Sequence, residues 1–348
     1  MSFTTPARPF DITALFPQLA PLARTATRLH PRPGSPTVND SSVGGPLLWP
    51  ADEPWPHCDE PHNRHATRVV YSPDDVRLLR RDLAAATERL RRDPQAPECT
   101  PDERETWERI KVGRPWFDGP IPLLPVAQLY AQDVPFPCPP DADLLQVLWC
   151  PFDHKETASP RTVLFWRSSA TVTDVLDAPP EPPIVQREYY LPEPCLFSPE
   201  QVTEYPNPRE LSKELRDRLL EDMSRWETID PARYNTYASD PGDLYVSSLC
   251  LAPGWKTGGW TLWDRMDPVP RPCPECGTEQ VPLLTIASRE WDGGGVTWIA
   301  EEEPTNPAPP PLGAKNGNFT LIDILGGYNL QLHVCPKSPD HPHIELAQ

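Results

Sequence analysis

The sequence lacks any long apolar run. None of its hydrophobic stretches approaches the roughly 18 to 20 residues that a membrane-spanning helix needs. Its first nine residues, MSFTTPARP, also lack the basic and then apolar order of a secretion signal. We therefore expect a cytoplasmic protein with no membrane association, in which the nine cysteines bind metal or pack in the core and form no disulfides.

Basic residues are scarce. The chain has 32 lysines and arginines against 50 acidic residues, a formal net charge of -18. Such a charge repels a nucleic-acid backbone. The most basic stretch, 77–92, interleaves arginines with apolar and acidic residues, which is typical of an amphipathic helix with a solvated face. We expect no nucleic-acid partner and favour a basic protein as the partner.

The common sequence signatures of catalysis are missing as well. The chain has no phosphate-binding loop, no Gly-x-Ser-x-Gly elbow, no His-Glu-x-x-His helix and no dinucleotide fingerprint. This lack favours a non-enzymatic function.

Proline, by contrast, is abundant, with 51 residues in 348. Proline ends helices and cannot donate to a strand ladder, so we expect short elements and long ordered loops. Twelve tryptophans and 38% apolar residues are too many for a disordered chain. The composition predicts an α+β fold, predominantly β, with long proline-rich loops.

A few segments have clear secondary-structure patterns. Ser72 and Thr100 each precede a proline and acidic residues, as helix caps do, and predict helices over 76–92 and from 101 to about 111. Further helices are predicted over 208–226 and, interrupted by prolines, over 10–24. Short strands are predicted at 144–149, 162–166, 245–251 and 319–325.

Two proline-rich stretches look like connections. Residues 177–196 divide the chain into a first unit, 1–176, with a helical insertion at about 73–112, and a second unit, 197–348. An acidic loop, 301–312, interrupts the second unit and is the best candidate for a mobile segment.

Three short blocks recur in the two halves in the same order, and they predict an internal duplication of a β-rich unit. The matching pairs are GGPLLW at 44–49 with GGWTLW at 258–263, PLLPVA at 122–127 with PLLTIA at 282–287, and LQVLWCP at 145–151 with LQLHVCP at 330–336.

The second half carries the clearest metal-ligand pattern. Cys273 and Cys276 form a Cys-x-x-Cys turn followed by glycine, which lets both thiolates face one point. A third thiolate, Cys335, lies at the end of the last repeat block, and His341 follows six residues later. Three thiolates and an imidazole complete a tetrahedral zinc site. His333 and His343 are alternatives to His341.

The first half offers Cys58, His62, Cys150 and His154 at the equivalent places. These residues predict either a second zinc site of the Cys2His2 type or a copy that has lost its metal. The remaining cysteines have no ligand pattern and are expected in loops or in the core; they are Cys99, Cys138, Cys195 and Cys250.

Several of these segments resemble the programmed cell death protein 2 family. The resemblance is carried by SVGG at 42–45, LPVAQLYA at 124–131, the block at 145–150 and VLFWR at 163–167. Residues 273–287 and 330–335 also resemble the related bacterial YwqG-like family of unknown function. The resemblance implies a duplicated, zinc-associated β-rich fold and, for its eukaryotic members, a chaperone that shields a basic ribosomal protein of the small subunit.

Taken with the resemblance, the residues favour a zinc-associated protein-binding module, such as a chaperone or a sequestering partner of a basic protein. A toxin-immunity protein and a regulatory scaffold are alternatives. A zinc-dependent hydrolase is the enzymatic alternative, because three ligands and a nearby carboxylate, Asp340 or Glu345, would leave room for an activated water. The sequence carries no signal for the oligomeric state.

Overall fold

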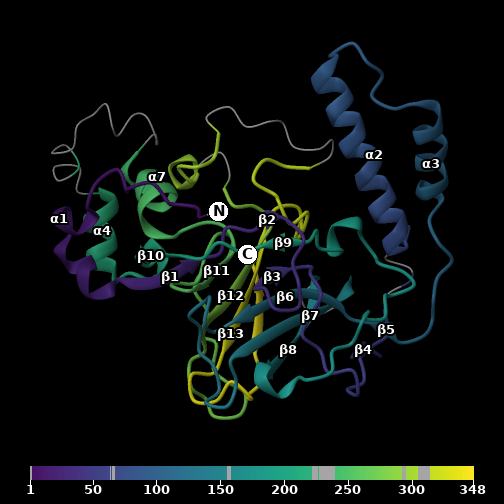
Figure 1. Ribbon diagram of the computed structural model, residues 1–348. Coiled ribbons are helices and arrows are strands. Elements are labelled where there is room, and N and C mark those ends of the chain that lie inside the picture. The colour runs from purple at the N-terminus through teal and green to yellow at the C-terminus, as the bar shows by residue number, and fades with distance from the viewer. Residues whose placement is uncertain are drawn as a thin grey trace.

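The computed structural model describes residues 2–62, 64, 67–154, 158–221, 226, 240–291, 295–304 and 314–348. Within them, strands form two six-stranded sheets and one two-stranded ribbon, all antiparallel, and helices lie around the sheets (Figure 1). The α+β class predicted from the sequence is confirmed.

The first large sheet, here called sheet A, is built mostly from the C-terminal half of the chain. Its strands, in spatial order, are β10 (Glu200–Glu204), β1 (Arg24–Arg28), β11 (Lys256–Gly258), β12 (Val281–Ala287), β13 (Asn329–Val334) and β14 (Ile344–Ala347).

The second large sheet, sheet B, is built mostly from the N-terminal half. Its strands are β2 (Arg32–Pro33), β9 (Cys195–Leu196), β3 (Ser42–Val43), β6 (Leu124–Tyr130), β7 (Leu144–Asp153) and β8 (Pro160–Arg167). The small ribbon pairs β4 (His57–Cys58) with β5 (Ile121–Pro122).

Sheets A and B have the same order of strands from the third position onward. In sheet B the strands β3, β6, β7 and β8 lie side by side in the order of the sequence. In sheet A the strands β11, β12, β13 and β14 do the same. The pairing of β6 with β7 is irregular between Pro125 and Ala127, and that of β12 with β13 between Pro282 and Leu284. The register therefore equates Pro125 with Pro282.

Strand pairing thus aligns the second repeat block three residues away from the match of the sequences, because Pro282 corresponds to Pro125 and not to Pro122. PLLPVA and PLLTIA begin with the same Pro-Leu-Leu, but the irregularity lies at the second proline of the first block and at the first proline of the second block. The block PLLPVA contains two prolines, and either can be matched with the single proline of PLLTIA. The pairing of the strands selects the second.

In each sheet, one of the first two strands comes from the other half of the chain. Strand β1 pairs in sheet A and the chain then enters sheet B as β2, while β9 pairs in sheet B and the chain then enters sheet A as β10. Both crossings contain a proline, Pro31 or Pro199. The predicted first unit, 1–176, thus supplies a strand to sheet A, and the predicted connection, 177–196, supplies one to sheet B.

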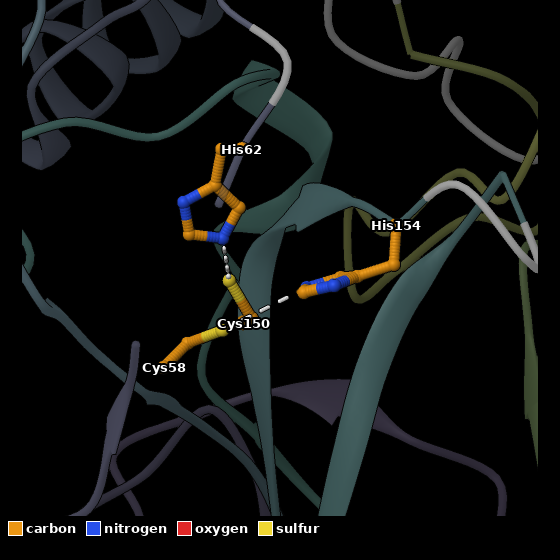
Figure 2. A group of neighbouring side chains, drawn as sticks. All are labelled: Cys58, His62, Cys150 and His154. Carbon is orange, nitrogen blue, oxygen red and sulfur yellow. Dashed lines mark hydrogen bonds between the residues drawn. The ribbon is translucent and has the colours of Figure 1, made fainter. Parts of the chain in front are cut away.

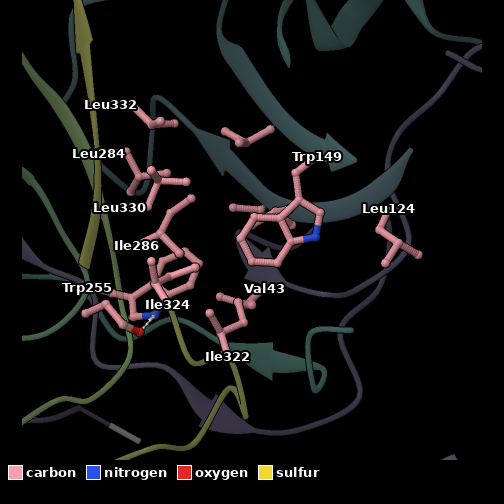
Figure 3. Close-up of a cluster of buried hydrophobic side chains, with 14 of the residues drawn as sticks. Val43, Leu124, Trp149, Trp255, Leu284, Ile286, Ile322, Ile324, Leu330 and Leu332 are labelled. Carbon is pink, nitrogen blue, oxygen red and sulfur yellow. Dashed lines mark hydrogen bonds between the residues drawn. The ribbon is translucent and has the colours of Figure 1, made fainter. Parts of the chain in front are cut away.

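The main core lies between the two sheets. Figure 3 shows side chains of β12 and β13 facing side chains of sheet B. Trp149 and Trp255 are its largest members, and their indole N–H groups donate to the carbonyls of Tyr190 and Ala287 at 3.0 Å. Burying such a side chain contributes about 1.5–3 kcal/mol, so this interface dominates the stability of the fold.

Two helices stand apart from the sheets as a hairpin, α2 (Pro73–Arg92) and α3 (Pro101–Val112) (Figure 1). Ser72 and Thr100 cap them as predicted, each in a capping box with an acidic residue three positions on. The base of the hairpin is tied down by Arg114, whose Nη2 donates to Asp75 Oδ1 at 2.7 Å.

A second group of helices covers the region beside β1 and β10 (Figure 1). It contains α1 (Ile12–Leu15), α4 (Lys213–Glu221), α7 (Pro241–Leu244), a 3-10 helix η1 (Pro17–Leu22) and a π-helix η5 (Tyr245–Cys250). Their side chains form a separate apolar cluster around Phe16, Leu219 and Tyr245. The remaining 3-10 turns are η2 (Ser169–Thr171), η3 (Glu188–Tyr190), η4 (Pro208–Glu210) and η6 (Val296–Trp298).

Two predicted strands are wrong. Residues 245–250 of the segment predicted as a strand, 245–251, form the π-helix η5. The prediction failed because a short buried apolar run has no periodicity that separates a strand from a helix. Residues 319–325 form no strand; Ile322 and Ile324 are buried there, and Ser288 Oγ accepts the N–H of Ile324 at 2.8 Å in place of a neighbouring strand.

The predicted helices at 10–24 and 208–226 are shorter than expected. The first breaks at Pro17 into α1 and η1, and Arg24 already begins β1. The second consists of the turn η4 and helix α4, and residues 222–225 lie outside the described residues. The same holds for 305–312 of the acidic loop.

Candidate metal centres

The structure brings the eight predicted ligands together in two groups of four. Cluster 1 consists of Cys58, His62, Cys150 and His154, and cluster 2 of Cys273, Cys276, Cys335 and His341. Within each cluster the four ligand atoms lie within 4.8 Å of one another, so each cluster can hold a metal ion. Figure 2 shows the four side chains of cluster 1 converging on one point.

Cluster 1 is assembled from three parts of the fold. Cys58 lies on β4 of the small ribbon, where it pairs with Ile121. Cys150 lies on the interior strand β7, next to the edge strand β8, and His154 follows the end of β7. His62 comes from the loop after the ribbon, and its ring packs on that of Phe152 with the centroids 4.4 Å apart. Strand pairing therefore positions two of the ligands before any metal binds.

The distances in cluster 1 suit a tetrahedral ion. His62 Nε2 lies 3.1 Å from Cys150 Sγ, and Cys58 Sγ lies 3.9 Å from His154 Nε2 (Figure 2). Zinc bound at about 2.3 Å to sulfur and about 2.0 Å to nitrogen would hold such pairs about 3.3–3.8 Å apart. The donor atoms therefore fit zinc with only small movements.

The ring of His154 is oriented from its far side. Its Nδ1 lies 3.0 Å from Glu60 Oε2, and Glu60 is itself held by Arg161. A carboxylate at the outer nitrogen of a ligating histidine fixes the ring and makes the inner nitrogen a better donor. Glu60 thus directs Nε2 of His154 toward Cys58.

The two thiols of cluster 1 differ in acidity. A hydrogen bond with Cys150, helped by His154 and His62, lowers the pKa of Cys58 to about 2 despite partial burial. Burial first, and then the interaction with Cys58, raise the pKa of Cys150 above its usual range. For His154, burial acts against protonation, but Cys58 and Glu60 outweigh it and raise the pKa of the ring. One thiolate is therefore ready to bind a cation, and the second ionises only when the cation compensates its burial.

Cluster 2 is built around a tight turn. Cys273 and Cys276 flank the turn, Gly277 closes it with φ +67°, and the N–H of Gly277 donates to Cys273 O at 2.8 Å. The N–H of Cys273 donates to Thr278 O at 2.8 Å, which aligns the two arms of the turn. Such a turn points both sulfurs to one side, as the Cys-x-x-Cys spacing predicts.

The remaining ligands of cluster 2 come from the C-terminal end of β13. Cys335 directly follows this strand, and its Sγ lies 3.5 Å from that of Cys276. His341 Nδ1 lies 3.4 Å from Cys273 Sγ, while its Nε2 lies 3.9 Å from Glu275 Oε2. As in cluster 1, a carboxylate faces the outer nitrogen of the histidine.

The thiols of cluster 2 also differ. Hydrogen bonds from Thr278 lower the pKa of Cys276 to about 6. Burial raises the pKa of Cys273; burial also acts against ionisation of Cys335, but the backbone N–H groups of Ser338 and Lys337 lower its pKa. Hydrogen bonds with Cys335 and Cys276 raise the pKa of His341.

The two clusters occupy equivalent positions in the two sheets. Cys58 pairs with Ile121 just before β6, and Cys273 bonds to Thr278 just before β12. Cys150 and Cys335 stand at the same point of the repeat block. The turn that in cluster 2 spans four residues is replaced in cluster 1 by a long segment that contains the α2–α3 hairpin. His62 therefore takes the place of Cys276.

Two other histidines considered as ligands are bound elsewhere. Nε2 of His333 lies 3.1 Å from Thr261 Oγ1, and burial lowers the pKa of His333 to about 3. Nε2 of His343 lies 2.8 Å from Thr162 Oγ1 on β8. Only His341 of the three joins the cysteines among the described residues.

The other cysteines lie where the sequence predicts. Cys195 and Cys250 are buried in the two apolar clusters, and Cys99 and Cys138 are half-buried outside the metal clusters. The sequence reasoning did not identify the supporting carboxylates Glu60 and Glu275. Their closeness to the ligands, two residues after Cys58 and inside the Cys-x-x-Cys turn, was the available signal.

No family model matches the chain, and no curated protein matches it. The resemblance to the programmed cell death protein 2 and YwqG-like families stays a prediction. None of the described helices is both long enough and apolar enough to cross a membrane.

Proposed function

We propose that both clusters are structural zinc sites and that the protein is a non-enzymatic binding module for a basic protein partner. The observation that carries the zinc assignment is the donor set. Two thiolates with two imidazoles, and three thiolates with one imidazole, are ligand sets of structural zinc. Hard cations such as magnesium and calcium prefer oxygen ligands, and neither cluster contains one.

The geometry favours a structural over a hydrolytic site. Four protein ligands fill a tetrahedral shell and leave no position for an activated water. Glu60 lies 3.0 Å from the outer nitrogen of His154, and Glu275 lies 3.9 Å from that of His341, so both carboxylates face the ligand rings on the side away from the thiols. Glu345, a candidate base, accepts a hydrogen bond from Thr162 Oγ1 at 2.6 Å.

In this proposal each zinc ion joins a segment outside the large sheets to the fifth strand of one of them. In cluster 1 it joins the ribbon residue Cys58 and the loop residue His62 to Cys150 of β7. In cluster 2 it joins the Cys273 turn to the end of β13. Because the β4–β5 ribbon, the loop at His62 and the Cys273 turn all lie outside the two large sheets, a bound metal ion fixes their position relative to those sheets.

We further infer that the two halves arose by duplication. The shared strand order, the equivalent irregularities at Pro125 and Pro282 and the equivalent clusters support this inference. In this view a unit comprises 24–167 or 195–347, and each unit gives its first strand, β1 or β9, to the sheet of the other. Such an exchange makes the two halves a single folding unit.

The assignment of a basic partner is supported by the net charge of -18. Acidic surfaces steer basic proteins to encounter at rates that fall with salt. The resemblance noted in the sequence implies a basic ribosomal client, and the lack of catalytic signatures is compatible with a binding function.

Elemental mass spectrometry of the purified protein tests the zinc assignment. We expect two zinc ions per chain in the parent and one in each of the variants Cys150→Ser and Cys276→Ser, because each change removes a thiolate from a different cluster. Cys99→Ser is the matched control and retains both ions. Protein prepared without chelator that contains no zinc would contradict the proposal.

A refolding assay tests the partner assignment. A basic protein of the small ribosomal subunit is diluted from denaturant with or without the present protein, and light scattering reports its aggregation. We expect suppression that weakens as salt is raised. An acidic client of similar size is the control, and equal suppression of both clients would contradict a preference for basic partners.

A further inference from the structure

The cysteine residues of the two clusters differ in their exposure to solvent. Cys276 is exposed, at the tip of the turn between β11 and β12. The other cluster cysteines are less open: Cys58 is half-buried, and Cys150, Cys273 and Cys335 are buried. In cluster 1 the place of Cys276 is taken by His62, which has no sulfur. A small oxidant in solution therefore meets one ligand sulfur before the rest.

The exposed sulfur has a second thiol beside it. Cys276 Sγ and Cys335 Sγ lie 3.5 Å apart, and a disulfide requires about 2.05 Å. The turn has room for this approach, because Pro274, Glu275 and Gly277 are exposed and, its two chain neighbours apart, no described residue has an atom within 4 Å of the Cβ position of Gly277. A shift of the turn by about 1.5 Å would bring the sulfurs into bonding distance.

We propose that Cys276 and Cys335 form a peroxide-sensitive dithiol that expels zinc from cluster 2 when it is oxidised. The inference rests on the proposed function, since it takes cluster 2 to hold zinc. The Cys276 sulfur attacks one oxygen of hydrogen peroxide, the O–O bond breaks, hydroxide leaves and is protonated to water, and Cys276 becomes a sulfenic acid. The Cys335 thiolate then attacks that sulfur, the S–S bond forms, and hydroxide leaves and is protonated to a second water.

The balance of this reaction is complete with peroxide as the oxidant. Two sulfurs give up two electrons in all, and one peroxide molecule is reduced to two waters. A disulfide no longer provides two thiolates, so only Cys273 and His341 remain as ligands and the zinc ion leaves. Cluster 1 also has two thiols, but Cys58 is half-buried and Cys150 is buried, so we expect peroxide to act on cluster 2 first and cluster 1 to retain its ion meanwhile.

Zinc release and peptide mapping test the proposal on the zinc-loaded full-length protein. Hydrogen peroxide is added with a chromogenic zinc chelator, and the protein is then alkylated and mapped by mass spectrometry. We expect release of one of the two zinc ions, a Cys276–Cys335 disulfide, and recovery of binding after treatment with dithiothreitol and zinc. Release of both ions at one rate, no release, or a disulfide between other cysteines would overturn the proposal.

The variant Cys276→His provides a matched control, because cluster 1 already uses a histidine at this place. We expect peroxide to form no disulfide in this variant and to release no zinc from it, whereas Cys99→Ser, which lies outside both clusters, retains two ions and behaves as the parent. If the parent holds no zinc at the outset, the proposed function fails. Mapping disulfides in that protein after peroxide treatment still tests whether Cys276 and Cys335 form a peroxide-sensitive dithiol. The absence of a Cys276–Cys335 disulfide there overturns the inference separately.

Discussion

Gln146 and Gln331 make the same hydrogen bond in two different sheets. Gln146 Nε2 donates to the carbonyl of Leu48 at 2.9 Å, and Gln331 Nε2 donates to that of Leu262 at 3.0 Å. Both glutamines are buried, and each holds the chain between the third strand of its sheet and its metal cluster. This pair supports the alignment of GGPLLW with GGWTLW and of LQVLWCP with LQLHVCP.

Replacing either glutamine by leucine is expected to destabilise the protein to a similar extent. Each variant leaves a buried carbonyl without its partner, which costs about 1–3 kcal/mol. Urea unfolding of Gln146→Leu and Gln331→Leu measures the loss, with the exposed Gln132→Leu as the control. A loss of stability in only one of the two variants would show that the two hydrogen bonds do not contribute equally to the free energy of unfolding.

Loss of the cluster 1 metal is expected to open the loop that leads to the helical hairpin. Cys150→Ser removes the thiolate that joins His62 to β7, so trypsin should cleave faster after Arg64 and Arg68 than in the parent. Cys276→Ser leaves cluster 1 intact and should show the cleavage rate of the parent. Gel analysis of timed digests measures the cleavage rates. Equal protection of the parent and both variants would contradict the proposal that the cluster 1 metal holds this loop against β7.

The buried ion pair between Lys256 and Glu204 is expected to be costly to break. Lys256 Nζ donates to Glu204 Oε1 at 2.5 Å, and their side chains are 2% and 0% exposed. Lys256→Met leaves a buried carboxylate unpaired and should lower the free energy of unfolding by about 3–5 kcal/mol. The double variant Lys256→Met/Glu204→Gln should recover most of this loss in urea unfolding. A double variant as unstable as the single one would argue against an unpaired charge as the cause.

His30 is expected to make the fold sensitive to acid. Burial, and then the nearby Arg28 and Arg32, lower the pKa of His30 to about 3, although Glu200 and Glu290 lie 3.3 Å and 3.6 Å from its ring nitrogens. The unfolded chain takes up this proton near pH 6.5 and the folded protein does not, so the contribution is lost as pH falls from about 6.5 to about 3.

The comparison of His30→Gln with the parent isolates this effect. Between about pH 7 and pH 5 the parent should lose about 2 kcal/mol more stability than the variant, because one proton difference is worth about 1.4 kcal/mol per pH unit. Urea unfolding at the two pH values measures the difference. Acid effects on the metal clusters are common to both proteins and cancel, and parallel losses would contradict the role of His30.

The metal ligands could be predicted from the sequence because their signals are local. Cys273 and Cys276 share one turn, and Cys335 and Cys150 stand at the end of a repeated block. The caps at Ser72 and Thr100 are equally local, since each helix begins with its own hydrogen-bond partners. Patterns that span only a few residues can be recognised without knowledge of the tertiary fold.

The strand exchange could not be predicted in the same way. Strand β9 has two residues and β1 has five, and neither has a pattern that names its neighbour. Their places depend on pairing with β3 and β11, about 150 to 230 residues away along the chain. Long-range pairing also decides the alignment of Pro125 with Pro282. The fate of 245–250 likewise depends on distant residues, because the side chains of this π-helix share an apolar cluster with Phe16 and Trp226.

X-ray absorption at the zinc edge of the purified protein tests the account most directly. Two closed sites predict four ligands per zinc, with between two and three sulfurs on average at about 2.3 Å and the rest nitrogens at about 2.0 Å. In Cys276→Ser the remaining ion should show two sulfurs and two nitrogens. Five or six ligands dominated by oxygen in the parent would contradict two structural zinc sites.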